Sequence, residues 1–203
     1  MPLLLNQTGC HAKVENNPSS KLLWFAVNVR PQFERSVAAI VRYNDFEEYL
    51  PLYRNCGDRS GRVRSLDRSL FPGYVFCRIN PDAKLQLQTI PGVQYIVGDG
   101  KTPTPVDDAE MAALQATARS GLPAEPWPFS KTGYRVLLND GPLTGLEGLM
   151  VAVRKRCRLV LPVTILNRSV AVEIERDWAT PIRVPGSQGT AKPLQGALAE
   201  GSR

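Results

Sequence analysis

The chain of 203 residues has very few of the side chains that enzymes most often use for acid–base and nucleophilic chemistry. Its one histidine, His11, lies near the N-terminus, which argues against schemes that pair a nucleophile or an acid with histidine. Its four cysteines (Cys10, Cys56, Cys77 and Cys157) include no C-x-x-C pair, so a zinc site is not expected. No convincing pair of carboxylates is present. The sequence predicts a protein that is not an enzyme and needs no metal or cofactor.

Long hydrophobic runs are absent as well. No apolar stretch approaches the roughly 20 residues of a membrane-spanning helix. The N-terminal sequence MPLLLNQTGC lacks the positive region and the apolar length of a signal peptide. The cysteine spacing gives no sign of a secreted disulfide framework. We therefore expect a cytoplasmic protein that does not enter a membrane.

Positive charge is in excess, and part of it is concentrated in one segment. The formal net charge is +6 and the sequence pI is about 9.3, which favours a polyanionic partner or a nucleoprotein assembly. Between Arg54 and Arg68 the chain is rich in arginine around a GDRSG turn, the pattern of a hairpin tip. Arg59, Arg62, Arg64 and Arg68 are the candidate contacts to nucleic-acid phosphates. A solvated loop is an equal alternative for this segment.

Residues 21–121 predict an α+β domain, after a polar segment over residues 1–20 that we expect to be disordered. The segment KLLWFAVNVR is typical of a buried strand, and an amphipathic helix follows it to about Tyr43. Asp107 and Glu110 form a D-x-x-E variant of the capping box, which predicts a helix that ends at Gly121. The order of strands and helices predicts an antiparallel sheet with packed helices. The further expected elements are strands over residues 47–55, 73–79 and 92–98 and a short helix over 80–91.

The stretch SLFPGYVFCRI contains an unusual concentration of aromatic residues. Successive side chains of a strand point to opposite faces. The residues predicted to face the core are Val75, Cys77 and Ile79. The residues of the other face are Tyr74, Phe76 and Arg78. Exposed aromatic residues are typical anchors of protein interfaces, so we expect this second face to be an interface. The alternative is that one of the domain's own helices covers it.

A change in composition marks a second domain. The segment LPAEPWPF contains three prolines, and residues 122–130 are expected to be a stiff, extended linker. Over residues 131–182, short runs of valine and leucine broken by glycine predict a small β-barrel. Gly141, Gly145 and Gly148 are expected to allow positive φ and close backbone approach in a tight corner, since no Gly-Lys-Ser/Thr of a P-loop follows. The tail, residues 183–203, is expected to be flexible.

Taken together, these segments resemble the NusG family of transcription elongation factors. GYRVLLNDGPLTGLEGLMVAV is similar to a KOW motif, the glycine-punctuated hairpin of a small SH3-like barrel. WFAVNVRP, LFPGYVFCRI and IPGVQYIVG resemble successive blocks of the NusG N-terminal domain. The resemblance covers about residues 22–182. The arginine-rich hairpin before LFPGYVF resembles the specialised antiterminators of the RfaH and UpxY type.

The resemblance implies a monomeric, non-catalytic factor of transcription elongation and antitermination. Phe71, Tyr74 and Phe76 match the positions that dock on the clamp helices of the largest subunit of RNA polymerase. The arginine-rich hairpin would contact upstream or non-template DNA, and the KOW domain would recruit Rho or a small-subunit ribosomal protein. The alternative from another class is a ribosome-associated KOW-type RNA-binding protein.

Two expectations concern the C-terminal domain. Its glycines and prolines oppose refolding into helices, and its β-branched runs alternate as strands do. We therefore expect a permanently β domain, loosely tethered, that leaves the aromatic face open. The cluster RKRCR, residues 154–158, is a candidate surface for RNA or an acidic partner, with a solvated loop as an equal alternative.

Overall fold

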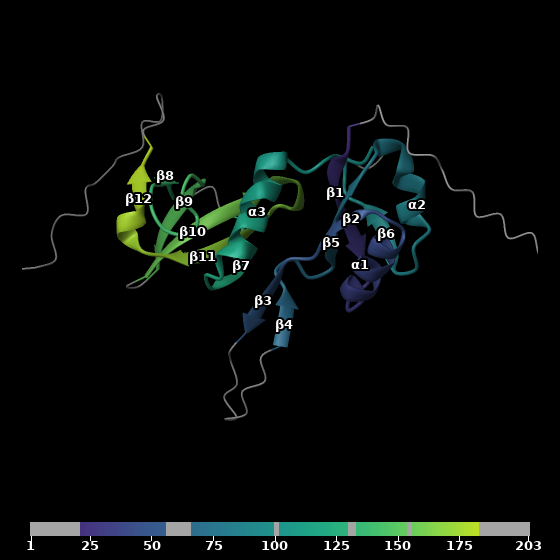
Figure 1. Cartoon of the computed structure of the whole chain (residues 1–203), viewed down its shortest axis with the longest axis horizontal. Helices are drawn as coiled ribbons and strands as arrows, with labels where there is room; N and C mark the ends of the chain where they lie inside the picture. Colours follow the sequence, from purple (N-terminus) through teal and green to yellow (C-terminus); the bar gives the residue numbers. More distant parts are fainter. Residues whose placement is uncertain (1–20, 56–65, 100–101, 130–132, 154–155, 183–203) are drawn as a thin grey trace, which may run out of the picture.

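The computed structural model describes residues 21–55, 66–99, 102–129, 133–153 and 156–182. Two antiparallel sheets lie on either side of one helix, and a two-stranded hairpin projects from the N-terminal part (Figure 1). The terminal segments that we expected to be disordered lie outside the described residues.

The N-terminal part follows the order of elements predicted from the sequence. Pro51 divides the expected strand over residues 47–55 in two, and the halves belong to different sheets. The strands are β1 (Leu23–Val29), β2 (Glu47–Tyr49), β3 (Leu52–Asn55), β4 (Leu66–Ser69), β5 (Tyr74–Ile79) and β6 (Val93–Ile96). The helices are α1 (Glu34–Tyr43), the 3₁₀ turn Pro81–Ala83, α2 (Lys84–Gln88) and α3 (Asp108–Ser120).

The four-stranded sheet has the order β2-β5-β1-β6, and all its pairs are antiparallel. Val75, Cys77 and Ile79 of β5 are fully buried, as the alternation predicted, in a core shared with α1 and α2. Burial raises the pKa of the Cys77 thiol to about 12, and the Glu48 carboxylate adds to the shift. This face of the sheet is therefore the ordinary hydrophobic core of the domain.

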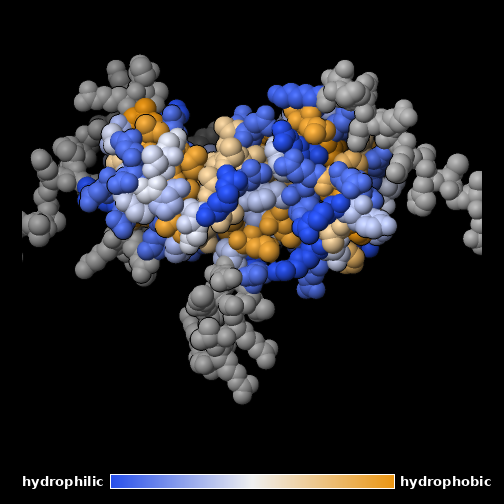
Figure 2. Space-filling model, viewed as in Figure 1, coloured by the Kyte–Doolittle hydropathy of each residue, from blue (hydrophilic) through white to orange (hydrophobic). Residues whose placement is uncertain are grey.

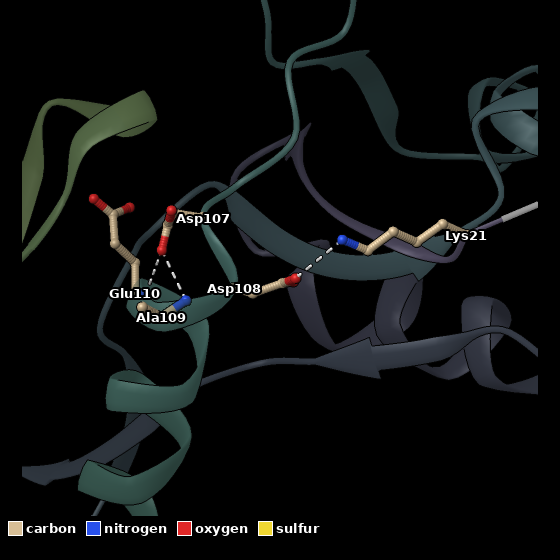
Figure 3. A network of polar contacts seen from close by, with 5 residues as sticks. All are labelled: Lys21, Asp107, Asp108, Ala109 and Glu110. Atoms are coloured by element: carbon tan, nitrogen blue, oxygen red, sulfur yellow. Dashed lines mark hydrogen bonds and ion pairs between the residues drawn. The ribbon is translucent and has the colours of Figure 1, made fainter.

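Helix α3 begins and ends where the sequence predicted. The Asp107 carboxylate accepts hydrogen bonds from the backbone N–H groups of Ala109 (2.7 Å) and Glu110 (3.3 Å), which is an N-cap (Figure 3). Gly121 follows the helix with φ of +69°, the left-handed conformation common after a helix end. Both ends of α3 are thus set by local sequence.

The C-terminal part is all β, as predicted. Its six-stranded sheet has the order β12-β8-β9-β10-β11-β7 around a core of buried valine and leucine. The fold is therefore an α+β domain followed by a small, SH3-like β domain. The strands are β7 (Ala124–Pro128), β8 (Tyr134–Leu138), β9 (Glu147–Val153), β10 (Arg156–Val163), β11 (Arg168–Ile174) and β12 (Ala179–Pro181). Two 3₁₀ turns, Thr164–Leu166 and Arg176–Trp178, join the last three strands.

Two of the three predicted glycines have a clear steric reason, although Gly148 lies inside β9 rather than in a corner and has no positive φ. Gly141 has φ of +80°, and a Cβ placed there would lie 2.6 Å from the Trp178 ring. A Cβ at Gly148 would lie 2.7 Å from Leu159 Cδ1. Real Cβ atoms do not approach other atoms so closely, so any larger residue at these two positions would force its neighbours to shift.

The proline-rich segment is extended, as expected of a linker, but most of it is hydrogen-bonded. Residues Ala124–Pro128 form β7, which pairs with β11 at the edge of the C-terminal sheet. Three residues, 121–123, separate the end of α3 from the start of β7. The expectation of a loose tether is therefore wrong for this part of the segment.

The corner glycines give a matched pair of variants. Gly141→Ala and Gly145→Ala both place a Cβ at a positive φ (+80° and +88°), but a Cβ at Gly145 has no atom within 4 Å. Backbone strain should lower the free energy of unfolding of each variant by about 1 kcal/mol. The clash with Trp178 should lower that of Gly141→Ala by about 1–3 kcal/mol more. Urea unfolding measures both. Equal losses would contradict the packing of Trp178 on this corner.

Candidate functional site

The aromatic residues predicted as an interface do lie together. The rings of Phe71 and Phe76 meet edge to face, with centroids 5.5 Å apart and an interplanar angle of 88°. Tyr49 of β2 joins them, with its ring centroid 6.4 Å from that of Phe76. Tyr74 is half-buried beside this group. We call Phe71, Tyr74 and Phe76 the aromatic face.

The expectation that the aromatic face is exposed was wrong. Phe71 and Phe76 have no solvent-exposed surface. They belong to a continuous hydrophobic core that includes Met111 and Leu114 of α3 and extends into the C-terminal sheet. Alternation along β5 correctly separated the two faces of the sheet. It carried no information on whether a helix and a second domain, distant in sequence, cover the second face.

Helix α3 is attached to the aromatic side of the sheet by a buried polar contact. The Tyr49 hydroxyl donates a hydrogen bond to the Leu114 carbonyl, at 2.9 Å. Burial raises the pKa of this phenol to about 12, and the nearby Arg119 opposes part of the shift. Tyr49 therefore stays a neutral donor across the physiological range.

The first turn of α3 is bound to the C-terminal domain. The Thr164 backbone N–H donates to the Glu110 carboxylate oxygens at 3.2 and 3.1 Å, and the Thr164 hydroxyl donates to Oε1 at 2.6 Å. Figure 3 shows the Glu110 side chain directed away from the helix, on the side where the C-terminal ribbon lies. The capping box was therefore half correct, because Asp107 caps the helix while the Glu110 carboxylate binds the other domain.

A second interdomain contact lies at Tyr74. The Arg168 guanidinium, at the start of β11, lies 5.2 Å from the centroid of the Tyr74 ring, a cation–π geometry. Its Nη1 also donates to the Pro72 carbonyl, at 3.4 Å. Arg168 thus holds the C-terminal domain against the loop that leads into the aromatic face.

Sequence reasoning missed Glu110, Thr164 and Arg168 as contacts between the domains. The pairs are 54 and 96 residues apart, and each residue is ordinary in its local context. Glu110 stands out in the sequence only as the acidic residue of a capping box in the first turn of a helix, where its charge stabilises the helix.

The predicted arginine-rich hairpin is formed at its base by β3 and β4. Arg68 is exposed and lies opposite Tyr53 in the register. Arg35 of α1 donates to the Asp67 carbonyl at 3.1 Å and so attaches the hairpin to the domain. Figure 2 shows hydrophobic surface just above the hairpin. Arg59, Arg62 and Arg64 lie outside the described residues.

The basic cluster of residues 154–158 is only partly described. Arg158 forms an ion pair with Glu125 of β7, and its guanidinium lies 5.1 Å from the centroid of the Trp127 ring. The side chain is therefore engaged with the proline-rich strand. Arg154 and Lys155 lie outside the described residues.

The described residues form neither a metal site nor a membrane-spanning helix. Within the described ranges, no group of three or more histidine, cysteine, aspartate and glutamate side chains could hold a metal ion. In the same part of the chain, every helix is too short or too polar to cross a membrane.

The architecture defines a class of protein: an α+β domain with an arginine-rich hairpin and a buried aromatic face, joined to a glycine-punctuated β domain. Known proteins are similar to this chain. A family model described as "Transcription termination factor nusG" matches residues 22–115. The NusG protein of Helicobacter pylori strain J99 is 30% identical over 122 residues, which are 57% of this chain and 68% of that protein. NusG of Escherichia coli O6:H1 is 29% identical over 169 residues, or 76% and 93% of the two chains.

The chain belongs to the NusG family of transcription termination/antitermination proteins. Its fold agrees with a solved structure of Thermotoga maritima NusG that concerns the domain interaction in that protein. The TM-score is 0.51 at 23% identity, and the match covers 80% of this chain and 98% of the other. This likeness extends over both domains.

Burial of the aromatic face has a measurable consequence for stability. Phe76→Ala should lower the free energy of unfolding by about 3–5 kcal/mol, because it leaves a cavity in the core that includes α3. Tyr43→Ala is the control, since Tyr43 is an aromatic residue with 86% of its surface exposed, and it should change stability by about 0.5 kcal/mol or less. Urea unfolding compares them. Similar effects of the two variants would refute the buried position of Phe76.

Proposed function

We propose that the protein is a transcription elongation and antitermination factor that binds RNA polymerase through Phe71, Tyr74 and Phe76. The observation that carries the proposal is an aromatic cluster on the N-terminal sheet of a chain that belongs to the NusG family. Aromatic residues that meet in one cluster have the composition of an interface hot spot. The clamp helices of the largest polymerase subunit are the proposed partner.

Binding through this face requires the domains to separate first. Phe71 and Phe76 are covered in this structure, so polymerase meets them only in an open form. The contacts of Glu110 and Arg168 are at the exposed rim, where a cation–π contact is worth about 1 kcal/mol and a hydrogen bond to a carboxylate about 1.5–3 kcal/mol. The apparent affinity for polymerase then equals the intrinsic affinity multiplied by the open fraction.

Arg168→Ala tests this opening step. Loss of its contacts to Tyr74 and the Pro72 carbonyl should favour the open form by about 1–2 kcal/mol. Where the closed form predominates, the apparent affinity for RNA polymerase should therefore rise about five- to thirtyfold. The apparent affinity is measured as binding of the full chain to surface-immobilised polymerase. Arg176→Ala, an exposed arginine of the same domain, is the control, and unchanged affinity of the Arg168 variant would argue against an obligatory opening.

We further propose that the hairpin arginines contact upstream or non-template DNA in the elongation complex. Arg68 is exposed on β4, and Arg59, Arg62 and Arg64 precede it in the chain. Loop Leu70–Gly73 joins β4 of the hairpin to β5, the strand that carries Tyr74 and Phe76. The hairpin is therefore held close to the aromatic face. Polymerase docking would therefore fix where the hairpin meets nucleic acid.

Salt dependence tests the DNA contact. Neutralising Arg59, Arg62 and Arg64 to glutamine should reduce the slope of log affinity against log salt by about 2–3 for the elongation complex, since each phosphate contact contributes about 0.7–0.9. Affinity for polymerase without nucleic acid should be unchanged. The matched control neutralises the exposed Arg30, Arg119 and Arg176. If both triple variants change the slope equally, only the net charge matters and the hairpin is a solvated loop.

The C-terminal β domain is proposed to recruit a second partner, with Rho and a small-subunit ribosomal protein as the candidates. The alternative of a ribosome-associated RNA-binding protein accounts for the β domain alone. It leaves the family match over residues 22–115 unexplained. Co-purification separates the two, because ribosomal subunits without polymerase would support the alternative. That the protein is a specialised antiterminator of the RfaH and UpxY type stays a prediction from the arginine-rich hairpin. A factor that acts on bacterial RNA polymerase is expected to be cytoplasmic.

A further inference from the structure

The proline-rich strand β7 is paired on one side only. It lies at the edge of the six-stranded sheet, antiparallel to β11, with Glu125 opposite Ala171 and Trp127 opposite Ser169. The Glu173 backbone N–H donates to the Pro123 carbonyl at 3.1 Å, so residues 123 and 173 form a hydrogen-bonded pair. What was expected to be a free linker is therefore an added strand of the C-terminal domain.

The position of the prolines in this strand follows from the hydrogen-bonding pattern. Hydrogen-bonded and non-hydrogen-bonded pairs alternate along an antiparallel ladder. Since residues 123 and 173 are hydrogen-bonded, Glu125 and Trp127 also direct their N–H groups to β11, and the nitrogens of Pro126 and Pro128 face outward. Proline is tolerated in a strand where its nitrogen faces the open edge. The outer edge of β7 thus has few donors for any further strand.

Besides the packing of Ala124 on the core, an arginine side chain attaches β7 to the sheet. Arg158 of β10, the strand beyond β11, forms an ion pair with Glu125 and lies over the ring of Trp127. Glu125 and Trp127 are two residues apart and so project from the same face of β7. A single arginine thus binds two consecutive side chains of that face.

Pairing of β7 decides how far the C-terminal domain can move from α3. With β7 paired, four Cα–Cα steps join Ser120, the end of α3, to Ala124, and they span at most about 14 Å. With β7 detached, the nine steps from Ser120 to Phe129 span about 30 Å. Prolines keep a free segment extended, so the detached strand would remain an extended spacer.

We propose that β7 is a releasable strap that sets two lengths for the tether between the domains. Paired with β11, the strap keeps the C-terminal domain within a short distance of α3 even after the interdomain contacts break. Detached, it gives this domain the longer reach needed to bind a second partner while the N-terminal domain stays bound elsewhere. The proposal concerns the conformation of the chain and does not depend on polymerase docking.

Hydrogen exchange of the full chain tests the strap directly. The amides of Glu125 and Trp127 should exchange faster than those of Leu159 and Leu161 in β10, because β7 opens without unfolding of the sheet. Arg158→Ala should accelerate exchange at Glu125 and Trp127 about tenfold and leave Leu161 unchanged. Arg176→Ala, in the same domain, should change neither. Exchange of β7 and β10 at one common rate, in parent and variant, would overturn the proposal and make β7 a permanent strand.

A disulfide provides an independent measurement. Glu125→Cys with Ala171→Cys places two cysteines at a hydrogen-bonded pair, where Cα atoms are about 5.5 Å apart and a disulfide fits. The four native cysteines are replaced by alanine, and Glu110→Gln with Arg168→Ala weakens the interdomain contacts. In small-angle scattering, reduction of the disulfide should lengthen the maximum dimension by up to about 15 Å, in proportion to the detached fraction. Identical dimensions in the oxidised and reduced forms would show that the strap does not detach.

Discussion

Burial of α3 on two sides is the constraint on which the rest of the structure depends. Met111 and Leu114 lie in one hydrophobic core with Phe76 of the N-terminal sheet and with the valines and leucines of the C-terminal sheet. Hydrophobic burial is non-directional and scales with area, so a helix packed between two sheets joins both into one core. The aromatic face is covered for this reason, and the two domains have a defined relative position without a covalent link beyond the chain itself.

Polar contacts at the rim select the geometry of that core. Glu110 accepts from Thr164, and Arg168 lies over Tyr74. Each is exposed and individually weak, so neither can hold the domains together alone. Their directionality defines which turn of the C-terminal domain meets which end of α3. An interface built from a common apolar core and few weak polar contacts can open as a unit when another surface competes for the apolar part.

The hairpin and the aromatic face are mechanically connected. The Leu70 backbone N–H donates to the Pro51 carbonyl at 2.9 Å, and the Glu34 carboxylate accepts from the Gly73 N–H at 2.8 Å. These bonds attach both ends of the loop between β4 and β5 to the body of the domain. The proposed binding of polymerase to the aromatic face would therefore also orient the hairpin.

Local patterns in the sequence determined much of the fold. Alternation put Val75, Cys77 and Ile79 in the core, Asp107 and Gly121 set the ends of α3, and Gly141 and Gly145 marked a corner of the C-terminal domain. Each of these depends on backbone conformation or on neighbours within a few residues, so composition and spacing suffice to find it. The three aromatic residues were also found from sequence, because they lie within six residues of one another.

Tertiary structure alone decided what covers those residues and how the second domain is attached. Met111 and Leu114 of α3, which share the core of Phe76, lie 35 and 38 positions away in the sequence, and no local pattern records the shape of a distant surface. Prolines determined that residues 124–128 are extended, since they fix φ and remove a donor. Pairing of this segment with β11 depends on a free sheet edge that forms only when the C-terminal domain folds. Sequence therefore determined the elements and the character of their faces, whereas packing determined which faces are open.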